Sequence, residues 1–486
     1  MNGNQKSKSL IAQVFAGFLL LCFSLSCNFV TRAFVYVTVT PTASVTPMLS
    51  ATPRPSRTPA PTLTPSATAL EVGLYIPSKC EGQPIATVSP DLVQLEPTPT
   101  LLPESELSLA DQTRILDDLS KVVSRVYLYP NFNGFDWNGE VKNIRTKVLS
   151  GMGTRDFYDA LDNLLQALND DHSQYQSPGV VKQMDGELAG HADFVGIGVL
   201  ILPLVEKQSI VILAVFPGSP AEHAGLKSHD SILAVDGLPV MEKEVSNNWR
   251  IRGPECTATV LTVQSPGEQP RQVMLVRQRI LTTVPVEARL VDTTDGSRVG
   301  YLMLPSFFDE TYPDQVRKVL EELGPLDGLI IDNRMNGGGS STVVKPILGF
   351  FSDGTLGHYV SRENRIPFTI EAEPINNSQQ VPLVILVGED TVSYGEIFTG
   401  VLQDIGRAEV VGKNTLGNVE VMRSYAFLDG SRIWIAEERF EPPVSAVDWE
   451  KDGIKPDVAV DFDWSTFTFE SDPCIRAAID LLAKRK

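Results

Sequence analysis

With 486 residues, 42% of them hydrophobic and 21% charged, the chain is long enough for two or three domains and has the composition of a soluble globular protein. The formal net charge of -19 and the lack of a dense stripe of Lys and Arg argue against a nucleic-acid partner, because phosphate backbones are bound by basic patches. A soluble, acidic chain of this kind suits a secreted protein.

Residues 1–27 have the pattern of a secretory signal peptide. Two lysines precede an apolar run at 10–25, which is shorter than the roughly 20 apolar residues of a spanning helix and is followed by small residues and Cys27. We therefore expect an extracytoplasmic protein, in the cell envelope or secreted. The letters FSLSC resemble a bacterial lipoprotein signal except at Ser24, where a leucine is usual. Membrane attachment through a lipid-modified Cys27, an uncleaved signal anchor and ordinary cleavage all stay open.

Residues 28–70 are rich in Thr, Pro and Ser, and proline recurs every few residues. Such a segment cannot bury enough apolar surface to offset the entropy lost on ordering. We expect a disordered spacer that holds the folded protein away from a membrane or wall.

Three cysteines, Cys80, Cys256 and Cys474, lie beyond the signal segment. One pair can close in an oxidising compartment. Because Cys80 and Cys474 flank the folded part of the chain, we predict that these two form the disulfide.

Residues 71–187 are expected to form a mainly helical region. The clearest helix is at 154–168, where apolar residues recur at the spacing of one buried helix face; they are Phe157, Leu161, Leu164, Leu165 and Leu168. Polar residues at 169–171 end this pattern, which places His172 in a turn.

Residues 188–282 resemble a PDZ domain in the order of their short strands, short helix and turns. The resemblance puts Gly196, Ile197 and Gly198 in the carboxylate-binding loop, whose backbone N–H groups bind a peptide C-terminus while the peptide adds a strand to the sheet. The alternative is that the glycines only permit a tight turn. His229 replaces a glycine that is usual in a later turn, and we expect this change to affect only that loop.

Residues 283–486 alternate buried apolar strands with helical patterns and end in a helix after Pro473. Alternation of this kind predicts an α/β domain in which helices cover a sheet.

Two motifs in this last domain carry chemistry. In DGLIIDNRMNGGGSS, at 327–341, an apolar strand runs into three glycines, whose backbone N–H groups can point together at a developing oxyanion. In TVSYGE, Ser393 lies between the apolar run at 383–387 and a helical pattern, a position where hydrolases often keep a nucleophile. A glycine cluster alone is more often a turn, but the two motifs together favour a serine hydrolase.

The order of the helical segment, the PDZ pattern, NGGG, SYGE, GRAEVVG and DGIKPDVAV resembles that of the carboxyl-terminal processing (tail-specific) peptidases, from about 105 to 462. The resemblance implies a multidomain α/β fold: a helical N-terminal region, a β-rich PDZ domain and a crotonase- or Clp-like α/β peptidase core. It also implies a serine endopeptidase.

Residue by residue, the resemblance places the nucleophile on Ser393. It places the oxyanion-hole donors on the backbone N–H groups of Tyr394 and of Gly337 or Gly338. It implies no cofactor.

The usual general base of this family is a lysine, and its position falls on Asn418, while a supporting glutamine falls on Met422. Lys413 lies too early in the motif to be assumed as a substitute. The chain is therefore either inactive or uses another base.

The segments NDDHSQY and WEKDGIKPD resemble those that carry the catalytic histidine and glutamate in the tricorn-like branch of the same superfamily, which also resembles this chain in NGGG. They place these roles on His172 and Glu450. A neutral imidazole can take the Ser393 proton while a carboxylate fixes its tautomer. The alternatives are a structural role for His172 in its turn, a solvated Glu450, and Glu420 as a rival carboxylate.

The sequence thus predicts an extracytoplasmic serine endopeptidase that captures unfolded or C-terminally exposed polypeptides through its PDZ unit. No His or Cys pair has the spacing of a metal site, so no metal is predicted. The alternative is a non-catalytic peptide-binding relative that has lost its base, and an envelope scaffold ranks last.

Overall fold

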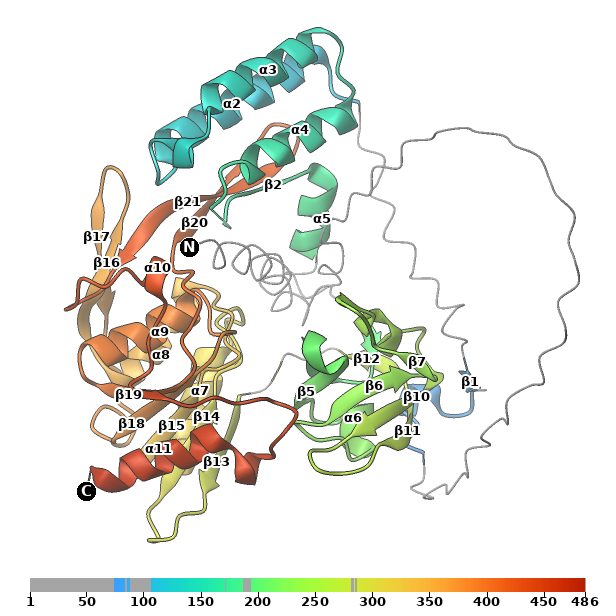
Figure 1. Cartoon of the computed structure of the whole chain (residues 1–486), viewed down its shortest axis with the longest axis vertical. Helices are drawn as coiled ribbons and strands as arrows, with labels where there is room; N and C mark the ends of the chain where they lie inside the picture. Colours follow the sequence, from blue (N-terminus) through green and yellow to red (C-terminus); the bar gives the residue numbers. More distant parts are fainter. Residues whose placement is uncertain are drawn as a thin grey trace, which may run out of the picture.

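The computed structural model describes residues 74–83, 85–87, 106–170, 172–186, 194–280, 284 and 286–485. These form a helical unit (106–186), a β-rich unit (194–280, to whose sheet residues 86–87 are added) and an α/β core (286–485), with the helical unit beyond one end of the core and the β-rich unit beside it (Figure 1). The predicted signal segment and spacer lie outside the described residues. Within the described part of the chain, none of the helices combines the length and the apolar character needed to cross a membrane.

The helical unit contains three amphipathic helices and one shorter helix. The helix predicted at 154–168 is confirmed, since its apolar face is buried. The elements are α2 Leu109–Val126, α3 Trp137–Leu149, α4 Thr154–Gln166, β2 Gln174–Gln176 and α5 Pro178–Gly186.

The helical unit is attached to the core through strand β2, which pairs antiparallel with the long core strand β21 (Arg432–Glu441). The buried faces of α2, α3 and α4 pack in one cluster with Ile433, Ile435 and Ala436 of that strand. This pairing places His172, two residues before β2, next to the core.

Within the described residues, the main core sheet has six strands in the order β13-β14-β15-β18-β19-β22, parallel except for β13 with β14. Helices α7, α8 and α9 cover one face and α11 the other, as the apolar clusters on the two faces show. The bounds are β13 Glu287–Val291, β14 Val299–Met303, α7 Tyr312–Leu323, β15 Gly328–Asp332, α8 Ser341–Phe351, β18 Leu383–Val387, α9 Tyr394–Asp404, β19 Ala408–Gly412, β22 Val458–Ala459 and α11 Pro473–Lys484.

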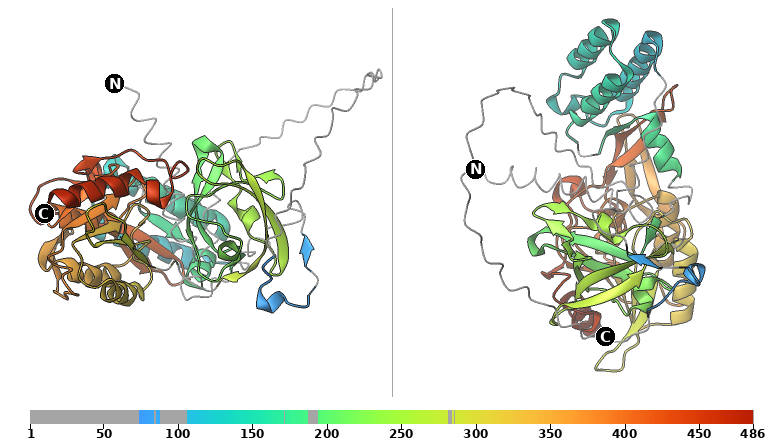
Figure 2. Two further views of the ribbon diagram at one scale, coloured as in Figure 1. Left: turned by 90° about the horizontal axis from the view of Figure 1, so that it is seen from below. Right: turned by 90° about the vertical axis from the view of Figure 1, so that its right-hand side faces the viewer.

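A second core sheet has the order β17-β16-β21-β2, with β20 also paired to β21. It extends from the core to the helical unit, as two further views also show (Figure 2). Its remaining strands, and the short helix that follows it, are β16 Gly354–Val360, β17 Arg365–Ile370, β20 Val421–Ala426 and α10 Trp449–Asp452.

The β-rich unit is built on a sheet of order β1-β10-β6-β5-β4, with β11 beside β10 and β7 beside β6. Its elements are β1 Ala86–Thr87, β3 Phe194–Gly196, β4 Val199–Leu204, β5 Ser209–Val215, α6 Pro220–His223, β6 Ser231–Val235, β7 Leu238–Pro239, β8 Met241–Glu242, β9 Val245–Ser246, β10 Thr257–Gln264, β11 Arg271–Val276 and β12 Gln278–Ile280.

The predicted disulfide between Cys80 and Cys474 is wrong. Cys80 is bonded to Cys256, with their Cα atoms 5.3 Å apart. The reason is that β1 pairs in parallel with the start of β10, which brings the segment before β1 beside Cys256. Cys474 is instead buried as a free thiol at the start of α11.

The expectation that His229 affects only its own loop is also wrong. His229 has a positive φ of 75° and is buried, and its ring stacks on Trp464 of the core at a centroid distance of 5.6 Å. Its Nδ1 lies 3.1 Å from the Trp464 carbonyl oxygen. His229 therefore joins the β-rich unit to the core, where Leu202 and Leu213 also pack against Trp464.

Candidate active site

Ser393 lies on a sharp turn between the buried strand β18 and helix α9. Its backbone has φ 56° and ψ -123°, a strained conformation for a residue with a side chain and the one found at nucleophile elbows. Its N–H donates to Oε2 of Glu396 at 3.2 Å. The turn thus presents the serine at the start of a helix, where the helix dipole favours developing negative charge.

The segment after β15 holds this turn in place. Asn333 donates from Nδ2 to the carbonyl oxygen of Gly395 at 2.8 Å and accepts a bond from the Thr391 hydroxyl at 2.8 Å on its own carbonyl. The carbonyl oxygen of Asn336 accepts from the N–H of Val392 at 2.9 Å. The sequence analysis gave no role to these two asparagines, although both precede the three glycines within the same motif and Asn336 begins NGGG.

The glycine motif lies directly against the serine. A Cβ added to Gly338, which has φ +90°, would lie 2.7 Å from Ser393 Cβ and 3.0 Å from the Tyr394 nitrogen. The N–H of Gly338 donates to Oδ1 of Asn336 at 3.0 Å. The Gly338 N–H is thus already bonded within its own loop, and which of the two glycine amides joins the Tyr394 amide in the oxyanion hole stays a prediction.

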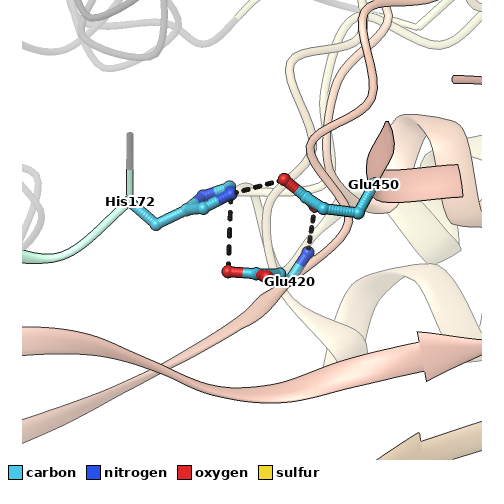
Figure 3. A group of neighbouring side chains, drawn as sticks. All are labelled: His172, Glu420 and Glu450. Carbon is cyan, nitrogen blue, oxygen red and sulfur yellow. Dashed lines mark hydrogen bonds and ion pairs between the residues drawn. The ribbon is translucent and has the colours of Figure 1, made fainter. Parts of the chain in front are cut away.

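His172 is fixed by the turn that precedes β2. Oδ1 of Asp170 accepts the N–H groups of His172 at 3.0 Å and of Ser173 at 2.7 Å, the pattern of an aspartate-initiated turn. The His172 side chain is only 4% exposed, and its Nε2 lies 3.0 Å from Oε1 of Glu450 (Figure 3). The structure therefore brings together these two residues that the resemblance paired.

Glu450 belongs to the short helix α10, and its second oxygen is also bound. Oε2 accepts the N–H groups of Val419 at 2.7 Å and of Glu420 at 3.0 Å. Burial alone would raise the pKa of the Glu450 carboxyl, but His172 and these two N–H groups lower it below its usual value. Glu450 is therefore a fixed carboxylate.

Glu420 is a second carboxylate at the same imidazole. Its Oε2 lies 3.8 Å from Nε2 of His172, its Oε1 accepts a hydrogen bond from the Tyr129 hydroxyl, and its side chain is only 2% exposed. Burial raises the pKa of Glu420 to about 7, with Glu450 adding to the effect and His172 opposing it. Burial lowers the pKa of His172, but Glu450 and Glu420 outweigh it and raise the value to about 9.

Ser393 and His172 both belong to the described part of the chain, and no hydrogen bond joins them there. The loop at 417–420 contacts both Glu396, beside Ser393, and Glu450, beside His172. Glu396, which binds the Ser393 N–H, accepts the N–H of Gly417 at 2.9 Å, and three residues later Glu420 donates its N–H to Glu450. The contact between Ser393 and Glu396 could be predicted from the sequence, because Ser and Glu three residues apart at a helix start form a capping box.

The residues at the family's base positions do not supply a base. Asn418 lies on the loop between Gly417 and Val419, and Met422 on β20 packs against the apolar cluster of the helical unit. Lys413 pairs with Asp461 at 3.0 Å.

The predicted peptide-binding loop of the β-rich unit is tightly packed. Ile197 is buried, and its carbonyl oxygen accepts the Ala221 N–H of α6 at 2.9 Å. Gly198 has φ +80°, and a Cβ there would lie 2.2 Å from Ser219 Cβ. Gly198 is thus required by close packing, while Gly196 ends β3. Their role in binding a peptide stays a prediction.

A strained serine at a helix start, with a glycine-rich loop packed against it, is an arrangement typical of serine hydrolases, and it places this protein in that class. The family model "Peptidase family S41" matches residues 298–460. The carboxyl-terminal-processing protease of Synechocystis sp. is 31% identical over 389 residues, which are 78% of this chain and 88% of that protein. The chloroplastic carboxyl-terminal-processing peptidase 2 of Arabidopsis thaliana is 26% identical over 72% of this chain and 69% of that protein.

Among solved structures, the photosystem II D1 C-terminal processing protease matches with a TM-score of 0.52 and 25% identity, over 76% of this chain and 97% of that chain. The chain belongs to peptidase family S41, the carboxyl-terminal processing serine proteases, whose substrates are polypeptides. The family inferred from NGGG and SYGE is confirmed, as is the multidomain α/β fold.

Proposed function

We propose that this protein is an extracytoplasmic serine endopeptidase in which His172, supported by Glu450, replaces the lysine base of its family. The observation that carries the proposal is the 3.0 Å contact between Nε2 of His172 and Oε1 of Glu450. With Nε2–H donated to the carboxylate, the neutral ring keeps its lone pair on Nδ1. That nitrogen would take the Ser393 proton.

The reaction follows from these roles. The Ser393 hydroxyl attacks a backbone carbonyl carbon as His172 takes its proton, and the N–H groups of Tyr394 and of Gly337 or Gly338 stabilise the oxyanion. The protonated His172 then gives its proton to the leaving amine, and water hydrolyses the acyl-enzyme. Catalytic hydrogen bonds are often long in resting enzymes and shorten only when substrate is bound. The reaction proposed here therefore requires a movement of the loop at 417–420 that brings His172 and Ser393 within hydrogen-bond distance.

The remaining parts of the proposal concern substrate and location. The β-rich unit would bind the C-terminus of an unfolded or C-terminally exposed polypeptide at residues 196–198, by the PDZ mode. The disulfide between Cys80 and Cys256 supports an oxidising, extracytoplasmic location. The signal pattern at 1–27 supports the same location, with Cys27 or a signal anchor as the means of attachment.

A second candidate is a non-catalytic peptide-binding relative. Asn418 and Met422 at the family's base positions favour it, and so does the raised pKa of His172, since a protonated imidazole accepts no proton. This candidate predicts binding of peptides without cleavage.

The deciding experiment compares the wild-type protein with Ser393→Ala, His172→Ala and the control Ser361→Ala, a serine on the β16–β17 turn whose hydroxyl accepts N–H groups of that same turn. A fluorophosphonate probe and an unfolded protein substrate are used side by side. We expect labelling and cleavage in the wild type and the control only. Cleavage that needs Ser393 but survives His172→Ala would transfer the base role to Lys413 or Glu420, and no Ser393-dependent reaction at all would favour the binding protein.

A further inference from the structure

We propose that His172, Glu420 and Glu450 form a binding site for a divalent cation, Zn²⁺ in particular, and that the bound ion inhibits the peptidase. The inhibition rests on the proposed role of His172 as the base, whereas the binding does not. One ligand atom from each of the three side chains lies within 4.8 Å of the other two.

The separations suit zinc. Zn²⁺ binds imidazole nitrogen and carboxylate oxygen at about 2.0–2.2 Å in tetrahedral geometry, which puts neighbouring ligand atoms roughly 3.4 Å apart. Nε2 of His172 lies 3.0 Å from Oε1 of Glu450 and 3.8 Å from Oε2 of Glu420. Small side-chain shifts would therefore seat the ion.

The charges of the cluster also favour a cation. Nε2 carries at most one proton, and two carboxylates converge on it, from α10 and from the loop residue just before β20 (Figure 3). Among the described residues no donor binds Oε2 of Glu420, although that side chain is only 2% exposed. A buried oxygen without a hydrogen bond is costly. A divalent ion would satisfy this oxygen and balance both carboxylates.

Each ligand is also held by groups that are not ligands themselves. The Tyr129 hydroxyl binds the other oxygen of Glu420, and the Val419 and Glu420 N–H groups bind the other oxygen of Glu450. Asp170 fixes the turn that carries His172. Outer contacts of this kind orient the ligands of metal sites and lower the cost of assembling them.

Zinc at Nε2 would remove the base. The ion takes the lone pair of Nε2, so the proton that Nε2 shares with Glu450 leaves this nitrogen and the neutral ring carries its one proton on Nδ1 instead. Nδ1 can then no longer accept the Ser393 proton. The sequence offered no sign of this site, because its ligands come from three separate segments rather than from one spaced motif.

The test of binding uses the full chain without a histidine tag, in a Ser393→Ala background, so that it does not depend on activity. Zn²⁺ binding is measured by equilibrium dialysis with metal analysis. We expect one ion per chain, and Glu420→Gln weakens binding by at least about tenfold, the lower end of the loss seen even for outer contacts. Glu438→Gln, at a buried glutamate on the adjacent strand β21, keeps the affinity.

No bound ion, or equal affinity in Glu420→Gln, would overturn the site whatever the peptidase does. The test of inhibition uses the wild-type enzyme, whose cleavage should fall with added Zn²⁺ and return with a chelator. Cleavage that ignores bound Zn²⁺, or that requires it, would overturn the inhibition while leaving the site itself in place.

Discussion

His172 and Glu450 are 278 positions apart in the chain, and the Nε2 of one lies 3.0 Å from the Oε1 of the other. Two elements produce this contact. Strand β2 pairs with β21 and carries His172 to the core, and α10 presents Glu450 to it. The helical unit is thus part of the candidate active site rather than a separate attachment.

Replacing Glu450 by Gln should lower kcat by roughly 10²- to 10⁴-fold, because the amide keeps the shape but no longer stabilises an imidazolium or selects its tautomer. The measurement is steady-state cleavage of a peptide substrate. Glu409→Gln, on β19, is the control and should leave kcat unchanged. If Glu420→Gln abolishes cleavage while Glu450→Gln does not, Glu420 is the carboxylate that supports His172.

The two halves of this site differ in how far the sequence predicts them. The position of Ser393 can be predicted from its local sequence, since an apolar strand, a serine and a helix with Glu396 in capping position follow one another within a few residues. His172 and Glu450 came only from a family resemblance. Their contact depends on β2, a strand of three residues whose pattern does not distinguish it from a loop.

The two wrong predictions, of the disulfide partner and of the role of His229, have the same physical origin. The disulfide was misassigned because β1 has only two residues, and no periodicity reveals that it pairs beside Cys256. The role of His229 was missed because a turn residue's contact with another domain leaves no mark in the local pattern. Short pairings and contacts between units are settled by three-dimensional packing.

Replacing Gly338 by Ala should abolish cleavage while leaving a folded protein. The added Cβ would lie 2.7 Å from Ser393 Cβ and 3.0 Å from the Tyr394 nitrogen, so the oxyanion loop must move away from the nucleophile. Loss of one oxyanion donor alone costs about 10²- to 10³-fold in kcat. Cleavage rates and thermal unfolding are measured together.

The control for this prediction is Gly430→Ala. Gly430 has φ +87°, similar to the +90° of Gly338, but an added Cβ meets nothing within 4 Å. Both variants should lose about 1–3 kcal/mol of stability from the strained backbone. Equal activity in the two variants would show that Gly338 is needed only for its backbone conformation.

Reduction of the disulfide between Cys80 and Cys256 should lower the free energy of unfolding by about 2–4 kcal/mol. Cys256→Ser should reproduce the loss, and reductant should then have no further effect on that variant. Denaturant titrations with and without reductant measure both. A protein unfolded without reductant should expose the Cys474 thiol to alkylation and keep Cys80 and Cys256 protected, and alkylation of Cys80 would contradict the pairing.

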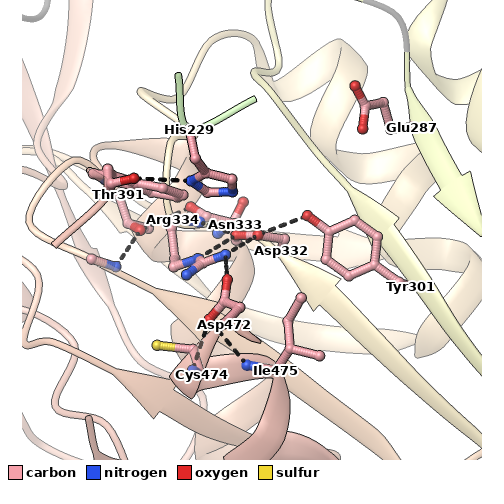
Figure 4. A network of polar contacts seen from close by, with 12 residues as sticks. His229, Glu287, Tyr301, Asp332, Asn333, Arg334, Thr391, Asp472, Cys474 and Ile475 are labelled. Atoms are coloured by element: carbon pink, nitrogen blue, oxygen red, sulfur yellow. Dashed lines mark hydrogen bonds and ion pairs between the residues drawn. The ribbon is translucent and has the colours of Figure 1, made fainter. Parts of the chain in front are cut away.

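Arg334 should make the core sensitive to acid. Its guanidinium binds Asp332 at 2.6 Å and Asp472 at 2.7 Å, and Asp332 also accepts the Tyr301 hydroxyl at 2.8 Å (Figure 4). Burial alone would raise the pKa of Asp332, but Arg334 and Tyr301 hold it below its usual value. This group therefore stabilises the fold above the unfolded pKa of about 3.9, and the stabilisation is lost as the pH falls through the lower folded pKa.

Asp332→Asn should accordingly cost about 3–5 kcal/mol at pH 7, since it removes one partner of a buried ion pair. The difference from the wild type should shrink below a pH of about 4, where the unfolded wild type takes up the proton that the variant lacks. Urea titrations across this range measure both variants, with the exposed Asp314→Asn on α7 as a control. Arg334 also stacks on Trp464 and is three residues before Gly337. A shift of Arg334 should therefore disturb the glycine loop beside Ser393, so that the variant loses cleavage at urea concentrations where it is still folded. A cost independent of pH would show that the Asp332 side chain acts by packing rather than by charge.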